Sequence, residues 1–459
     1  MSTSPRRKLF GTDGVRGPAG RFPLDAVTIR TLGTSLAVHL QETLGRPPTI
    51  VIGRDTRESG PWLEQALIDG ATGGGAECKS AGVITTPGVA YLARTLNADA
   101  GVVISASHNP YQDNGVKMFA PSGRKLDDET ERLIESDIFT SPDERRWQYE
   151  KGTGRNPGDL GIQLRTRYLD FLASEIGQGL SLTTLHLVID CANGAASNLA
   201  PSLFERLGAT VIATNNTPDG RNINRDCGSL HIESLQQKVV AEKADLGVAF
   251  DGDADRSIFV DAKGRYVDGD GTLWVLANYL QARSELDHGV VVATVMSNIG
   301  LEIALRSRGI RLVRTDVGDK YVLDELIRTG ASLGGEQSGH IIFPRLSLAG
   351  DGMITTIGLL RAMSEERQSL HELTEGFERY PQILVNVEVL EKRPFASVES
   401  IQKLVNETES LLGDRGRLLL RYSGTEPLAR VMIEGESQSE IEALARNLAA
   451  LIGRTLGKS

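Results

Sequence analysis

Cysteines and long apolar runs are both scarce in this chain, and each scarcity excludes a class of protein. Cys78, Cys191 and Cys227 are the only cysteines among 459 residues, too few and too widely spaced for a zinc site or a disulfide framework. No run of about 18 apolar residues occurs, so we expect no membrane span. The basic segment MSTSPRRKLF lacks an apolar stretch, so we expect no signal peptide and a cytoplasmic location.

Positive charge is also in deficit. Lysine and arginine together number 50 against 60 aspartates and glutamates, which gives a net charge of -10 at pH 7. A chain of this balance has no basic field to attract nucleic acid or an anionic membrane surface, so neither is expected as a partner. Small anions would have to be bound by local groups. The length suffices for about three or more domains.

A dense group of polar residues follows an apolar run in the segment Gly101–Phe119. Gly101 to Ile104 is typical of a short buried strand, and the next residues read SASHNP. Ligands of open α/β sheets bind beyond such strand ends, which favours a reactive loop. A solvated Asx/Pro turn is the alternative, and composition alone does not separate the two. Neighbours on an extended chain point to opposite faces, so we expect no Ser–His pairing of the hydrolase kind within this loop.

A second polar loop, DGDADR, follows the apolar run Leu246–Phe250. Its carboxylates, Asp251, Asp253 and Asp255, stand at alternate positions and could direct their oxygens at one hard cation such as Mg²⁺. The alternative is an acidic surface turn. The apolar strand before the loop weakens that alternative, because three crowded like charges would have only Arg256 to offset them.

The remaining chain predicts α/β architecture with internal repetition. An apolar strand, a polar glycine-containing loop and a helix recur near Val51, near Leu187 and at Val290–Asn298, which indicates three similar α/β domains with mixed sheets. Beyond Pro381, alternating strands and two helices indicate a smaller α+β domain. We expect domains at residues 1–155, 156–257, 258–377 and 378–459, with the strand Ser257–Asp261 opening the third.

Two later motifs are weak when taken alone. In Gly335–His340, GEQSGH, the side chains of Glu336 and Ser338 could bind sugar hydroxyls, and His340 could move a proton or contact phosphate. In the segment RYSGTEP, Gly424 leaves backbone N–H groups open to an anion. Each motif is also compatible with an ordinary turn.

The four motifs in this order resemble the signature loops of the α-D-phosphohexomutase superfamily, over nearly the whole chain. LFGTDGVRG at Leu9–Gly17, and GEQSGH in place of GEMSGH, resemble the amino-sugar branch. The resemblance implies interconversion of glucosamine 6-phosphate and glucosamine 1-phosphate through a 1,6-bisphosphate, for UDP-N-acetylglucosamine and cell-wall precursor synthesis. Alternatives are a phosphomannomutase or phosphoglucomutase with the same mechanism, or a phosphatase that uses water as acceptor.

The resemblance also assigns roles to residues. Ser107 would carry the phosphoryl group, Arg16 would contact it, and His108 and Lys117 would belong to the catalytic machinery, with Lys117 or His340 as general base. One Mg²⁺ would bind Asp251, Asp253, Asp255 and a phosphate oxygen on Ser107. The implied substrate-binding residues are Arg256, Gly318, Asp319, Glu336, Ser338, Arg421, Ser423, Gly424, Thr425 and Arg430.

The partners implied are small molecules. The resemblance implies a phosphosugar substrate, with glucosamine 1,6-bisphosphate as intermediate and activator, and a monomer or homodimer. The four motifs lie far apart in the sequence, so they can meet only if four domains surround a central cleft. We therefore expect a hinge near Arg379–Ile383 that lets the bisphosphate reorient.

Overall fold

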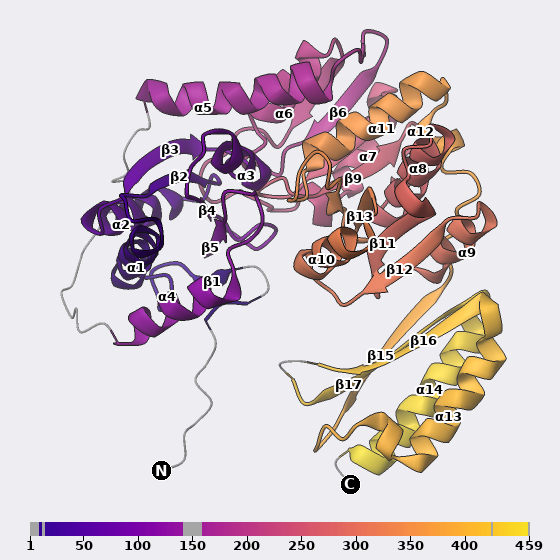
Figure 1. The fold of residues 1–459 in the computed structure, drawn as a ribbon. Helices are drawn as coiled ribbons and strands as arrows, with labels where there is room; N and C mark the ends of the chain where they lie inside the picture. The colour runs from indigo at the N-terminus through magenta and orange to yellow at the C-terminus, as the bar shows by residue number, and fades with distance from the viewer. Residues whose placement is uncertain (1–8, 12–13, 141–157, 424–425, 458–459) are drawn as a thin grey trace, which may run out of the picture. The chain divides into compact units, whose positions relative to one another are not determined.

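The computed structural model describes residues 9–11, 14–140, 158–423 and 426–457, which form four sheets (Figure 1). The first sheet has the order β1-β5-β4-β2-β3. β2, β3 and β4 run parallel, whereas β5 is antiparallel to both β4 and β1. The strands are β1 (Val15–Pro18), β2 (Thr49–Arg54), β3 (Glu77–Val83), β4 (Ala100–Ile104) and β5 (Asp113–Phe119). The helices are α1 (Ala26–Leu44), α2 (Gly60–Gly73), α3 (Thr86–Thr95) and α4 (Asp128–Thr140).

Local sequence explains these elements. Asp25 caps α1 by accepting a hydrogen bond from the Thr28 N–H, and Gly45 ends the helix with a left-handed φ of 68°. β4 is buried along its whole length, as its unbroken apolar sequence predicts for a central parallel strand. β3 ends at Val83, and Thr85 two residues later is the N-cap of α3, where its side chain accepts a hydrogen bond from the Gly88 N–H.

The second sheet has the order β10-β9-β8-β6-β7. Its strands are β6 (His186–Asp190), β7 (Thr210–Thr214), β8 (Leu246–Phe250), β9 (Ser257–Asp261) and β10 (Tyr266–Val267). Its helices are α5 (Gly158–Asp170), which continues as a π-helix over Phe171–Ile176, α6 (Leu199–Arg206) and α7 (Glu233–Glu242). The prediction that Ser257–Asp261 opens the third domain is wrong, because this strand pairs with a strand of the second sheet. The tight DGDADR turn folds this strand back antiparallel to β8, so β9 completes the second sheet.

The third sheet has the order β12-β11-β13-β14, with β11 parallel to β13 and β13 antiparallel to β14. Its strands are β11 (Val290–Thr294), β12 (Arg311–Thr315), β13 (Leu333–Gly335) and β14 (Ile341–Ile342). The helices of this region are α8 (Gly269–Ala282), α9 (Ile299–Ser307), α10 (Asp319–Thr329), α11 (Gly352–Glu366) and α12 (Leu370–Leu373).

One strand order recurs in these three sheets. Numbering four successive strands of each sheet along the chain gives the spatial order second, first, third, fourth: β3-β2-β4-β5, β7-β6-β8-β9 and β12-β11-β13-β14. In every case the connection from the third to the fourth strand carries a signature motif: SASHNP, DGDADR or GEQSGH. The prediction of three similar α/β domains with mixed sheets is confirmed.

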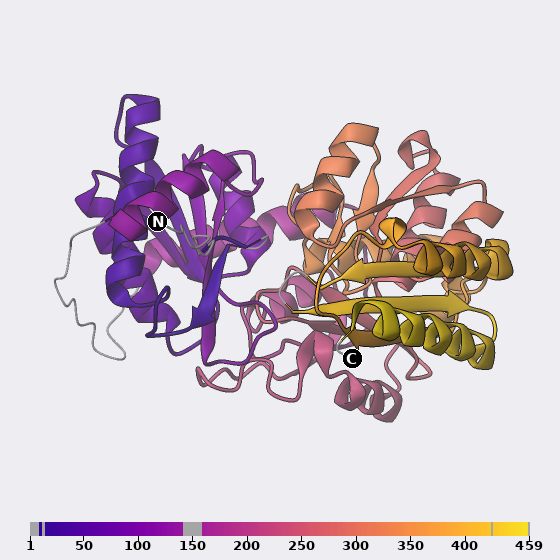
Figure 2. The same ribbon diagram turned by 90° about the horizontal axis from the view of Figure 1, so that it is seen from below.

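The fourth sheet is antiparallel, with the order β15-β17-β16. It comprises β15 (Gln382–Glu388), β16 (Gly416–Tyr422) and β17 (Leu428–Gly435), and its helices are α13 (Glu399–Leu412) and α14 (Gln438–Leu456). The two helices lie side by side along one face of this sheet (Figures 1 and 2). They bury an apolar core that includes Ile401, Val431 and Leu448. The predicted smaller α+β domain is confirmed.

The described chain divides into two compact units. One consists of the residues up to Val295 together with Val313–Thr374, and the other of Met296–Leu312 together with the residues from Glu375 onward. The first unit holds the SASHNP segment between β4 and β5, here called the serine loop, the DGDADR segment between β8 and β9, here called the aspartate loop, and the GEQSGH loop. The second unit holds α9 and the C-terminal α+β domain. No helix in the described part of the chain is long and apolar enough to cross a membrane. The central cleft and the hinge stay predictions.

Candidate active site

Ser107 lies in a tight turn directly after β4. Its backbone φ is 53°, in the left-handed region, and the residue is 1% exposed. The Ser107 N–H donates to the Ser105 hydroxyl at 3.0 Å, and the Ser107 Oγ donates to Asp251 Oδ2 at 2.5 Å. The serine and aspartate loops, which are far apart in the sequence, therefore meet at these two side chains.

His108 is closer to Ser107 than an extended chain would allow. Its Nδ1 lies 3.2 Å from Ser107 Oγ, so the expectation that these two neighbouring side chains point to opposite faces is wrong. The reason is the left-handed conformation of Ser107, which brings the next side chain back over the hydroxyl. Burial, followed by the positive charges of Arg256 and Arg16, lowers the pKa of His108 to about 4. The imidazole is therefore uncharged at neutral pH.

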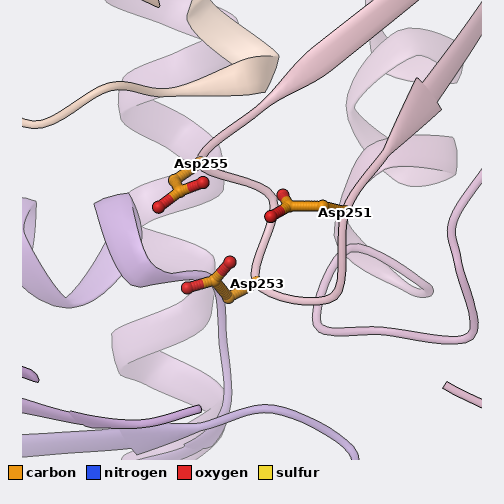
Figure 3. Close-up of side chains that lie close together, drawn as sticks. All are labelled: Asp251, Asp253 and Asp255. Carbon is orange, nitrogen blue, oxygen red and sulfur yellow. The ribbon is translucent and has the colours of Figure 1, made fainter. Parts of the chain in front are cut away.

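Asp251, Asp253 and Asp255 form a compact buried group in the turn between β8 and β9. Each offers an oxygen, and these oxygens all lie within 4.8 Å of one another. The three carboxylates project from successive parts of one loop toward a shared centre (Figure 3). Ala254 has a left-handed φ of 55°, and its carbonyl accepts the Gly352 N–H at 3.1 Å, which fixes the loop from α11.

This group of carboxylates fits a Mg²⁺ ion. Asp253 Oδ1 is buried and accepts no hydrogen bond from any described residue, and hard oxygen ligands of this kind are those that Mg²⁺ prefers. Burial and the charges of Asp255 and Asp253 raise the pKa of Asp251. Burial also acts to raise the pKa of Asp255, but Lys117 and His340 hold it well below its ordinary value. A divalent cation would relieve the repulsion among the three carboxylates.

Both candidates for the general base lie against the aspartates. Lys117, on β5, is 2% exposed, and its Nζ donates to Asp253 Oδ2 at 2.8 Å and to Asp255 Oδ2 at 3.2 Å. His340 Nδ1 lies 3.6 Å from Asp255 Oδ1. Burial acts to lower the pKa of His340, but the carboxylate of Asp255, with smaller contributions from Asp319 and Glu336, raises it to about 9. The structure thus brings together both residues that the resemblance implied.

The GEQSGH loop is organised around Glu336. Its Oε1 accepts the Gly318 N–H at 3.1 Å, and its Oε2 accepts the Ser338 hydroxyl at 3.2 Å. Asp319 accepts a hydrogen bond from Lys125 Nζ at 2.7 Å and lines a cavity of about 470 Å³ between residues 119–128 and α10. The predicted sugar-binding residues of this loop therefore lie together, with backbone and side-chain polar groups already oriented.

The predicted phosphate-binding residues of the C-terminal unit lie at one end of its sheet. Arg421 and Arg430 stand directly opposite each other on β16 and β17, a like-charge pair that an anion would stabilise. Ser423 is buried, and its carbonyl accepts Lys392 Nζ at 2.5 Å. The other two predicted members of this loop, Gly424 and Thr425, lie outside the described residues.

Sequence reasoning missed several polar residues that contact the serine and aspartate loops. Thr86 Oγ1 donates to Asp253 Oδ2 at 2.5 Å, while Arg57 and Asn224 donate to backbone carbonyls of the serine loop. A signal for Arg57 was present in the sequence. β2 and β4 are parallel neighbours, so the charged segment after β2 and the SASHNP segment after β4 must emerge at the same edge of the sheet.

Family models cover each part of this architecture. The chain matches the phosphoglucomutase/phosphomannomutase α/β/α domain I over residues 7–145, domain II over 166–264, domain III over 268–380 and the C-terminal domain over 384–451. Among solved structures, a phosphoglucomutase/phosphomannomutase family protein from Burkholderia thailandensis is 24% identical with a TM-score of 0.78, and 97% of each chain is covered. The N-acetylphosphoglucosamine mutase of Aspergillus fumigatus, solved with GlcNAc-6P and magnesium, is 19% identical with a TM-score of 0.63, covering 97% of this chain and 95% of that one. The fold is therefore that of the phosphohexomutases.

Curated relatives match this chain over almost its full length. A protein of Solibacter usitatus named phosphoglucosamine mutase is 48% identical, covering 98% of this chain and 100% of the relative. A protein of the same name from Koribacter versatilis is 44% identical, covering 99% and 98%. The chain belongs to the phosphoglucomutase/phosphomannomutase family. The superfamily resemblance and the prediction of an enzyme of the mutase class are confirmed.

Proposed function

We propose that this protein interconverts glucosamine 6-phosphate and glucosamine 1-phosphate. The observation that carries the proposal is the hydrogen bond of 2.5 Å from Ser107 Oγ to Asp251 Oδ2, which places a serine hydroxyl at the edge of three buried carboxylates. That is the arrangement needed for a serine that carries a phosphoryl group. The amino sugar is favoured because the relatives at 44–48% identity bear the name phosphoglucosamine mutase.

Phosphoryl transfer begins from phosphorylated Ser107. The bond from phosphorus to Ser107 Oγ breaks and a bond to a sugar hydroxyl oxygen forms, which gives the 1,6-bisphosphate. In net terms the hydroxyl proton moves to Ser107 Oγ. Lys117 or His340, each held as a cation against the aspartates, would give a proton to Ser107 Oγ and take the hydroxyl proton in exchange. After the bisphosphate turns over, its other phosphoryl group returns to Ser107 by the same exchange in reverse. Phosphorus, oxygen and protons therefore balance over the cycle.

Asp251, Asp253 and Asp255 are the residues that would hold a Mg²⁺ ion, with an oxygen of the Ser107 phosphate as a further ligand. When bound, the ion supplies positive charge that offsets the negative charge of the transferring group. Thr86 and Lys117 hold the Asp253 carboxylate in place for this role. Arg16 and Arg256, whose charges act on His108, would add cationic contacts to phosphate and sugar.

The remaining predicted residues would bind the parts of the substrate that do not react. Glu336 and Ser338 offer an acceptor and a hydroxyl to the sugar, next to the backbone of Gly318 and the carboxylate of Asp319. Arg421, Ser423 and Arg430, with Gly424 and Thr425, would hold the phosphate that is not transferred. A fixed distal phosphate selects which end of the sugar faces Ser107.

The test is phosphorus NMR of the purified protein with Mg²⁺ and a trace of glucose 1,6-bisphosphate. Glucosamine 6-phosphate, glucose 6-phosphate and mannose 6-phosphate are offered separately, and the rate of appearance of each 1-phosphate is measured. We expect the amino sugar to be converted fastest. Faster conversion of a neutral sugar would contradict the assigned substrate, and release of inorganic phosphate alone would indicate a phosphatase.

A further inference from the structure

The Arg57 side chain is fully buried and is saturated with acceptors from the serine loop. Arg57 is 0% exposed. Its Nε donates to Asp55 Oδ2 at 2.8 Å. Its two terminal nitrogens, Nη1 and Nη2, donate to four backbone carbonyls, those of Pro110, Asp113 (3.0 Å), Ser107 (2.9 Å) and Asn109 (2.8 Å). The five N–H bonds of the guanidinium are thereby used: three of them end on the loop that carries Ser107 and one on Asp113, the first residue of β5.

The ion pair of Arg57 with Asp55 is not a source of stability by itself. Both side chains are fully buried, and removing two charges from water costs about as much as their attraction returns. Asp55 is itself tied to the loop, because its Oδ2 accepts the Ser105 hydroxyl at 2.6 Å. The hydrogen bonds of Arg57 and Asp55 therefore hold the backbone of the serine loop in one conformation, which indicates that the pair specifies this conformation.

Asn224 reaches the same carbonyls from the second sheet's side. Its Nδ2 donates to Ser107 O at 2.8 Å and to Asn109 O at 3.0 Å. Each of these two carbonyls therefore accepts one hydrogen bond from Arg57 and one from Asn224. Gly252 of the aspartate loop packs close by, since a Cβ at that position would collide with Ser107 O.

The conformation held in this way is one that serine does not favour. A left-handed φ such as the 53° of Ser107 brings Cβ close to the following carbonyl oxygen, so the surroundings must impose it. It is also the conformation in which Ser107 Oγ contacts Asp251. A displacement of about 1 Å in a reacting group can lower a rate by about 100-fold.

We propose that Arg57 and Asn224 are positioning residues, which fix Ser107 in its left-handed conformation by holding its carbonyl and that of Asn109. This inference rests on the proposed role of Ser107 as phosphoryl carrier. Neither residue contacts the reacting atoms, so their substitution should slow the transfer step and leave binding of the sugar phosphate nearly unchanged.

The experiment measures how fast Ser107 is phosphorylated by glucose 1,6-bisphosphate, by intact-mass spectrometry in single turnovers with Mg²⁺. The variants are Arg57→Lys, which keeps the charge but has too few donors for the four carbonyls, Asn224→Ala, and the two together. Matched controls are Arg54→Lys, whose guanidinium pairs with Glu64, and Asn222→Ala, which lies in the same loop as Asn224 and bonds to Thr217 O. Steady-state kcat and KM, and the thermal unfolding midpoint, are measured for each.

We expect Arg57→Lys to slow phosphorylation by about 100-fold and Asn224→Ala by about tenfold, with KM within about twofold of wild type. Because both act on the same carbonyls, the double variant should lose less than the product of the single losses. The controls should stay within about twofold of wild type, since neither contacts the serine loop.

The outcomes separate the two proposals. Wild-type protein that the bisphosphate does not phosphorylate would overturn the proposed function and the inference with it. Wild-type protein that is phosphorylated, together with Asn224→Ala and Arg57→Lys at wild-type rates, would overturn the positioning role alone. If Arg57→Lys does not fold, Asn224→Ala decides: a slowed transfer at unchanged KM and unfolding midpoint supports the role, and a wild-type rate refutes it.

Discussion

Ser107 and Asp251 are 144 positions apart in the sequence and are joined by a hydrogen bond of 2.5 Å. Each stands at the end of a buried strand in its own sheet, β4 for the serine and β8 for the aspartate. The bond is therefore a direct contact between the first two α/β domains.

Replacing Ser107 with alanine should abolish mutase turnover, because no other group at this position can carry the phosphoryl group. We expect kcat to fall by at least about 1,000-fold. The far-ultraviolet circular dichroism spectrum and the oligomeric state should match those of the wild type, since the loop keeps its contacts to Arg57 through backbone carbonyls. Residual turnover above about one per cent would refute the assignment of Ser107 as the carrier.

Mg²⁺ should stabilise the fold by binding the three aspartates. At a concentration about 100 times its dissociation constant, a ligand of the native state adds about 2.7 kcal/mol to the free energy of unfolding. Thermal unfolding should therefore shift upward when Mg²⁺ is added after treatment with a chelator. The shift should be lost in Asp253→Asn, which removes one of the ligand charges while keeping the shape of the side chain. A variant that keeps the full shift would place the ion elsewhere.

The three cysteines should differ in reactivity toward a thiol reagent. Burial, followed by the charge of Asp190, raises the pKa of Cys191 and brings that of Cys227 to about 12, whereas Cys78 is only partly buried. A raised pKa means less thiolate at every pH below it, so at about pH 8 the two buried thiols should stay unreactive. Ellman titration should give one fast equivalent in the native protein and three after unfolding. Three fast equivalents without unfolding would contradict the structure.

Glu434 should be important for the stability of the C-terminal unit. This carboxylate is fully buried and accepts bonds from Arg417 Nη2 at 2.8 Å and from the Ile299 N–H at 3.1 Å. Glu434→Ala would leave a largely buried arginine without its partner, so we expect a loss of about 3 to 5 kcal/mol in urea unfolding. The exposed pair of Arg415 with Glu436 serves as control, because Glu436→Ala should cost less than about 1 kcal/mol. Equal losses in the two variants would refute the role of burial.

Much of this architecture could be predicted from local sequence. The apolar run Leu246–Phe250 predicts a strand at its observed bounds, because an apolar run between polar segments has few other structures open to it. The aspartate loop was likewise found as a group, since three carboxylates at alternate positions of one short turn cannot lie far apart. In both cases the deciding forces act within a few residues.

The errors arose where the spacing of apolar residues does not report the backbone conformation of a turn or the burial of a charged side chain. β9 was assigned to the wrong domain because its pairing with β8 depends on how the aspartate turn folds, which the alternation of side chains does not report. The contact of His108 with Ser107 was missed because a left-handed serine is imposed by Arg57 and Asn224. Arg57 itself was passed over, since a single charged loop gives no indication that its charge is buried.

The repeated strand order has a consequence for how such an enzyme can diverge. The proposed phosphoryl carrier, the proposed cation ligands and the proposed sugar-binding residues occupy the same connection, third strand to fourth, in three copies of one sheet plan. The three motifs are therefore carried by three different sheets. On the proposed roles, substitutions in GEQSGH should alter sugar preference while the strands that carry SASHNP and DGDADR keep their register. The transfer chemistry would then be separable from the choice of sugar.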